Sequence, residues 1–69
     1  MNLGDYLKRE QPEKYRVLKV NQWGTEDLTA YARYFLMWKV ISVMTVKKPG
    51  TEDVVCIFIR DWEYLRNDR

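Results

Sequence analysis

The segment 40–60, VISVMTVKKPGTEDVVCIFIR, decides the fold of this chain. Its two ends, residues 40–48 and 54–60, are rich in β-branched side chains, which favour strands. Pro49 and Gly50 stand between them and suit the second and third positions of a tight turn. We therefore expect a β-hairpin, and pairing Lys48 with Asp53 across the turn sets its register.

This register predicts which side chains share a face, because successive strand residues point to opposite sides. The expected core face holds Val40, Met44, Val46, Val55, Ile57 and Ile59. The opposite face holds a mixed set, namely Ile41, Val43, Thr45, Lys47, Val54, Cys56, Phe58 and Arg60. The middle of that second face is apolar, so we expect it to be covered either by a terminal helix or by a partner.

A short helix is expected upstream, over Leu3–Glu10. Asn2 can accept a hydrogen bond from the Asp5 amide, and Asp5 completes the spacing of a capping box. Pro12 ends the helix, because proline disfavours a helical conformation in the residue before it. Residues 15–23 then predict a strand with interrupted alternation, which is typical of a sheet edge.

The stretch 25–38 favours a central helix, with Thr25 as its cap and the acidic Glu26 and Asp27 in its first turn. A strand is the alternative, because every second residue from Leu28 to Val40 is apolar. Asp61 predicts a cap for a last short helix over residues 62–67. The expected fold is α+β, a small antiparallel sheet of hairpin plus edge strand, with element order α-β-α-β-β-α.

The composition limits how so small a domain can be stabilised. The chain has 69 residues, enough for one domain (1–69) with a thin core. It has one cysteine and no histidine, which excludes an internal disulfide and a structural zinc site. Three Trp, five Tyr and two Phe supply the large side chains instead. No apolar run approaches the length of a membrane span and no secretory signal is recognisable, so we expect a cytoplasmic protein.

Catalysis is poorly supported by the residues present. Without histidine there is no default general base near neutral pH. Cys56 lies among apolar strand residues, where a thiol is usually a small buried hydrophobe rather than a nucleophile. The acidic pairs are explained as caps and turns, and no phosphate-binding loop is present. We expect neither an enzyme nor a cofactor, metal or small-molecule substrate.

Protein binding is the expected function, with self-association as one form of it. Aromatic, methionine and arginine side chains are enriched at interface centres. The predicted partner-binding residues are Ile41, Val43, Phe58, Arg60 and Trp62. Size and composition also suit an accessory or inhibitor protein of a phage or mobile element that acts on a host protein.

Nucleic-acid binding is the alternative. Lys47 and Lys48 flank the predicted hairpin tip and could contact phosphates, with neighbouring aromatic side chains stacking on bases. The net charge is only +2, and basic and acidic residues alternate along the chain. This weak charge pattern makes nucleic acid the less favoured partner.

Overall fold

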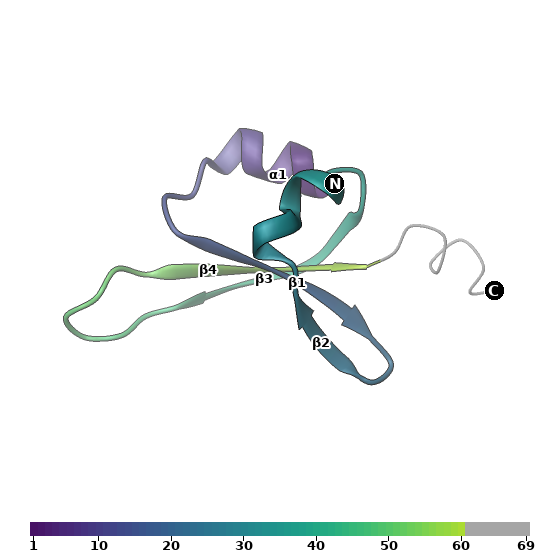
Figure 1. Ribbon diagram of the computed structural model, residues 1–69. Helices are drawn as coiled ribbons and strands as arrows, with labels where there is room; N and C mark the ends of the chain where they lie inside the picture. The colour runs from purple at the N-terminus through teal and green to yellow at the C-terminus, as the bar shows by residue number, and fades with distance from the viewer. Residues whose placement is uncertain (61–69) are drawn as a thin grey trace.

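The computed structural model describes residues 1–60 as a small α+β fold (Figure 1). The elements in chain order are the helix α1 (Leu3–Glu10), the strands β1 (Tyr15–Asn21) and β2 (Gly24–Asp27), the 3-10 helix η1 (Thr29–Tyr34), and the strands β3 (Lys39–Val46) and β4 (Val54–Arg60). The helix predicted over 62–67, its expected cap Asp61 and the candidate residue Trp62 lie outside the described residues.

The four strands form one mixed sheet in the order β2-β1-β4-β3. The β1–β2 and β3–β4 pairs are antiparallel, whereas β1 and β4 run parallel. The prediction of a purely antiparallel sheet with the first strand at its edge was therefore wrong. The residues Gln22 and Trp23 form a two-residue turn that folds β2 back along the outer side of β1, so β1 becomes a central strand.

The C-terminal hairpin is confirmed, but its predicted register was wrong by one residue. Val46 pairs with Val54 and Val43 with Ile57, and a bulge at Ile41 shifts the pairing between Val40 and Ser42. The amide of Thr51 donates to the Lys48 carbonyl, so the tight turn over Pro49 and Gly50 closes at Thr51, two residues before Asp53. A one-residue slip moves a whole strand's side chains to the other face, and Met44 and Val46 accordingly leave the core face.

The predicted N-terminal helix is confirmed with its cap. The Asn2 side chain accepts the Asp5 amide at 2.8 Å, and Gln11, before Pro12, leaves the helix with a φ of 44°. The amides of Leu3 and Gly4 donate to the carbonyls of Trp38 and Leu36. These bonds satisfy amides that a helix start leaves without partners, and they fix α1 to the segment that leads into β3.

The central helix predicted over residues 25–38 was wrong. Its first residues form β2, because Gly24 adopts a φ of +135° that lets the chain reverse and place Thr25 opposite Val20. Only Thr29–Tyr34 is helical, as 3-10 turns with a non-helical Tyr31 inside. Residues 35–38 remain outside any helix and supply the carbonyls that α1 uses.

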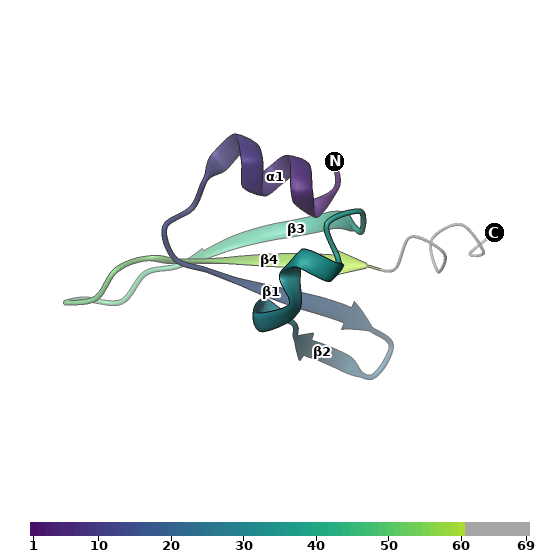
Figure 2. The ribbon, with the colours of Figure 1, turned by 45° about the horizontal axis from the view of Figure 1, so that its top comes forward.

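Both helices pack on the same side of the sheet, as Figure 2 shows. The core between helices and sheet consists of Leu3, Val17, Leu28, Ala32, Ile57 and Ile59, with partly buried side chains packed around it. Leu28 is buried, and Phe35 lies partly buried with its ring edge-on to Trp38 at 4.7 Å between ring centroids. Among the helices of residues 1–60, none is long and apolar enough to cross a membrane.

Candidate protein-binding surface

The sheet face opposite the two helices carries a continuous set of apolar side chains. Cys56 and Phe58 alternate with the core residues Ile57 and Ile59, so they point to this second face. Leu18 pairs with Phe58 in the neighbouring strand and shares its side of the sheet. We call this surface the open face, and its apolar members are Leu18, Val20, Met44, Val46, Val54, Cys56 and Phe58.

No helix of residues 1–60 covers the open face (Figures 1 and 2). Leu18 and Phe58 in the two central strands are half-buried, and Met44 on the outermost strand is 53% exposed. Neighbouring strands shield such side chains only from the flanks. An apolar strip across the sheet is thus left without a covering layer from the described part of the chain.

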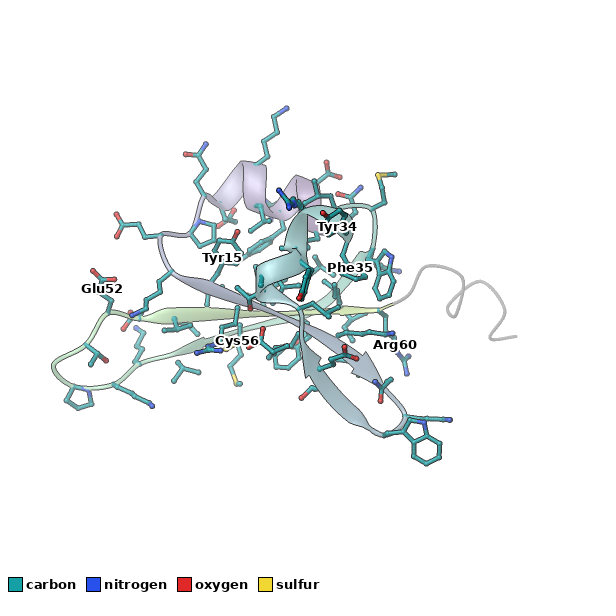
Figure 3. All side chains as sticks on the ribbon, in the orientation of Figure 1. Tyr15, Tyr34, Phe35, Glu52, Cys56 and Arg60 are labelled. Carbon is teal, nitrogen blue, oxygen red and sulfur yellow. The ribbon has the colours of Figure 1, made fainter. Side chains whose placement is uncertain are left out.

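Cys56 is the buried member of this face, at 8% exposure. Arg16 on β1 and Met44 on β3 lie directly opposite it on either side, and both side chains are longer than a cysteine. Figure 3 shows the Cys56 side chain pointing away from the helices, whereas Tyr15 points toward them. The thiol therefore forms part of the floor of the face, as expected of a cysteine that acts as a small hydrophobe.

One end of the open face is hollowed between the hairpin and the start of β1. The hollow has a volume of about 650 Å³ and is lined by Lys14, Tyr15, Arg16, Thr29, Val46, Lys48, Thr51, Glu52, Val54 and Cys56. Three cations and one carboxylate give its wall a positive balance. An open, basic-walled hollow with an apolar floor can hold a side chain or short segment that carries negative charge.

A polar network fixes the junction of β1, β2 and η1 beside this hollow. The Thr29 hydroxyl donates to Asp27 Oδ1 at 2.5 Å and accepts the Val17 amide at 3.0 Å. The Thr29 amide also donates to Asp27 Oδ1, and Arg16 Nη1 lies 2.7 Å from Asp27 Oδ2. The bonds from the hydroxyl and amide of Thr29, with a smaller contribution from Arg16, lower the pKa of Asp27 below its ordinary value of 3.8.

The structure separates the residues that the predicted register had placed together. Phe58 and Arg60 lie half-buried on the open face, but Val43 pairs with Ile57 and so belongs to the helix side. Ile41 sits in the bulge, 41% exposed. Phe58 and Arg60 are thus brought together, whereas Ile41 and Val43 lie on the outermost strand.

Lys47 and Lys48 are exposed at the projecting end of the hairpin (Figure 1). The aromatic neighbours expected to assist them lie elsewhere. The ring of Tyr34 is contacted by Arg33 at 5.1 Å on the opposite side of the sheet from the hollow. Of the lysine pair, only Lys48 contributes to the hollow, where Tyr15 is the aromatic residue.

Trp23, expected at the end of a strand, is an exposed aromatic residue in a turn. It lies at the tip of the β1–β2 turn, 87% exposed, and its amide donates to Asn21 Oδ1. The spacing of Asn21 and Gly24 around two residues was the signal for this turn, because asparagine and glycine favour tight hairpins.

Among residues 1–60, no group of three or more His, Cys, Asp or Glu side chains is arranged to hold a metal ion. Comparison of the chain with family models, curated proteins and solved structures gives no match. Function is therefore inferred from the surface itself.

Proposed function

We propose that this protein is a non-enzymatic protein-binding module that holds its partner on the open face. The observation that carries the proposal is the apolar strip across β1, β4 and β3, which no helix of residues 1–60 covers. Apolar patches of this kind on small domains mark interaction sites. Phe58 is the proposed aromatic anchor, with Leu18 beside it and Arg60 at the border.

The proposed partner presents apolar side chains bordered by acidic residues. Lys39 pairs with Arg60 at one end of the open face, and Lys14 and Lys48 line the hollow at the other end. Charges at an interface border steer the partner and select against others more than they add affinity. Acidic residues at the border of the partner's surface would complement the basic residues at both ends of the open face.

The size and composition of the chain further suit an accessory or inhibitor protein of a phage or mobile element, acting in the cytoplasm on a host protein. Trp62, two residues after Arg60 in the sequence, remains a predicted contributor.

Site-specific photo-crosslinking tests the proposal. A photo-activatable amino acid replaces Leu18 on the open face or, as the matched control, Tyr34 on the helix side, which is 67% exposed. The proteins are irradiated in a lysate of their native host cells, with and without nuclease. We expect a discrete protein adduct, resistant to nuclease, at position 18 and not at position 34. Equal labelling at both positions would refute the open face as the site.

Nucleic-acid binding remains the second candidate, because Lys14, Arg16 and Lys48 line one hollow. Glu52 stands in the same wall, and Arg16 is already engaged by Asp27. If phosphates bind there, replacing Lys47 and Lys48 together by alanine lowers the affinity for DNA or RNA and reduces its salt dependence by about one unit per lost contact. An adduct at position 18 that nuclease removes would favour this candidate.

A further inference from the structure

The two outermost strands of the sheet differ in how their free edges are protected. The strand β2 has only four residues, and Glu26 and Asp27 place charges along it. Short, charged edge strands resist pairing with other chains. The strand β3 has eight residues, and no charged residue lies between Lys39 and Lys47.

The outer edge of β3 is occupied only at its start. The Val40 amide donates to the Met1 carbonyl at 3.0 Å, and Asn2 forms an isolated antiparallel bridge with Lys39. No other strand among residues 1–60 pairs with β3 on this side, so the edge is open from Ile41 to Val46. This segment carries no charge and presents apolar side chains on both faces of the sheet, with Val43 39% exposed on one face and Met44 53% exposed on the other.

We propose that two copies of this chain join through these open edges, pairing β3 antiparallel to β3 around a two-fold axis at Met44. An axis perpendicular to the sheet places a residue opposite itself at the centre and keeps each face continuous between the copies. Centring the pairing on Met44 sets Val43 opposite Thr45 and Ser42 opposite Val46. All of these residues lie in the open part of the edge.

The neighbouring register centred on Val43 is excluded by residues already in place. Centring on Val43 sets Val40 opposite Val46 and Lys39 opposite Lys47, where like charges oppose pairing. It also drives the second copy into Met1 and Asn2, which occupy that part of the edge. In the register centred on Met44 each Lys47 faces Ile41, and no lysine faces another.

A second copy fits this edge better than an unrelated strand, because the open segment complements itself. Pairing between two copies requires no acidic residues on the partner strand. It also places the exposed Met44 side chains of the two copies against each other on the open face. Pairing joins the two four-stranded sheets into one and doubles the area of the open face. The inference rests on the edge of β3 and is independent of what binds the open face.

Cysteine crosslinking tests the register. Met44→Cys is made together with Cys56→Ala, because Cys56 lies opposite Met44 within the same hairpin and would compete for the new thiol. Across the axis the two Cα atoms would be about 4.5–5.5 Å apart, within the range of a disulfide. The matched control is Val43→Cys with Cys56→Ala, whose two copies lie on the diagonal, roughly 8 Å apart by strand geometry.

Under mild oxidation, we expect a disulfide-linked dimer from Met44→Cys at least tenfold faster than from Val43→Cys. Sedimentation equilibrium of the unmodified protein should give a dimer, and Met44→Lys should weaken it at least tenfold while leaving a folded monomer. A wild-type protein that stays monomeric, or equal crosslinking at the two positions, would overturn the proposal. A wild-type monomer that still forms the Leu18 adduct would overturn the dimer alone and leave the proposed function standing.

Discussion

The Thr29 hydroxyl offers a sharp test of how η1 is attached to the sheet. Val17 is fully buried, and its carbonyl accepts the Leu28 amide at 2.7 Å while its own amide donates to Thr29 Oγ1. The Thr29 side chain thus accepts a hydrogen bond from β1 at a position beyond the end of its pairing with β2. Thr29→Val keeps the shape of the side chain and removes the hydroxyl, so the Val17 amide loses its partner.

The expected loss in the free energy of unfolding comes from the Val17 amide, which is left without a hydrogen-bond acceptor. An unsatisfied buried donor costs about 1–3 kcal/mol, whereas the lost bond to the exposed Asp27 carboxylate adds little. A chain of 69 residues has a total stability of roughly 3–10 kcal/mol. With a urea m-value of about 1 kcal/mol/M for a protein this small, the unfolding midpoint should fall by about 1–3 M.

Two measurements test this role of the Thr29 hydroxyl. Urea unfolding compares Thr29→Val with Thr29→Ser, which keeps the hydroxyl and should lie close to wild type. A titration of the Asp27 carboxylate by NMR should show its pKa rising toward 3.8 in Thr29→Val, because the largest cause of its lowering is removed. A Thr29→Val protein as stable as Thr29→Ser, with an unchanged Asp27 pKa, would refute the assigned role of the hydroxyl.

Three further predictions follow from burial and charge. Ile57→Ala should cost about 2–5 kcal/mol in urea unfolding, whereas Val43→Ala on the neighbouring, partly exposed strand should cost about 1 kcal/mol; equal costs would contradict the difference in burial between these two paired residues. Because the folded-state pKa of Asp27 is lowered, its stabilisation is complete above pH 3.8 and is lost as the pH falls through the folded value, so acid unfolding should be less steep in Asp27→Asn. Cys56 should react slowly with a soluble thiol reagent in the native protein, and Cys56→Ala should keep partner binding; rapid native labelling would contradict its place in the sheet.

The sequence predicted those elements whose signals are local. Asn2 and Asp5 define the start of α1, Pro12 marks its end, and Pro49-Gly50 identifies the hairpin. The predicted hairpin register was wrong because the loop between β3 and β4 contains more residues than the tight turn within it. No local signal in the sequence shows how many of the other loop residues lie before the turn and how many after it. The bulge at Ile41 follows Lys39 and Val40, which pair with Asn2 and Met1 from the distant N-terminal segment.

The prediction for the stretch after β1 was wrong because Thr25, the expected helix cap, pairs with Val20 in β2. The helix η1 begins only at Thr29, whose amide donates to the Asp27 side chain. The position of β1 between β2 and β4 results from long-range pairing, which composition does not reveal. For the candidate surface, the alternation of side chains along the strand predicted Phe58 and Arg60 on one face. Leu18 lies on the same face because β1 pairs with β4, and this parallel pairing was not predicted.

The central claim is that the open face takes a protein partner while the domain folds without it. The most direct measurement is affinity capture from a nuclease-treated lysate with Phe58→Glu, compared with wild type and with Tyr34→Glu on the helix side, with amide hydrogen exchange recorded on each protein. We predict that Phe58→Glu keeps wild-type exchange protection in β1 and β4 and loses the captured protein, whereas Tyr34→Glu keeps both. Loss of protection throughout the sheet in Phe58→Glu would show that this side chain is buried in the core, because an unpaired charge there unfolds the domain, and would contradict the claim.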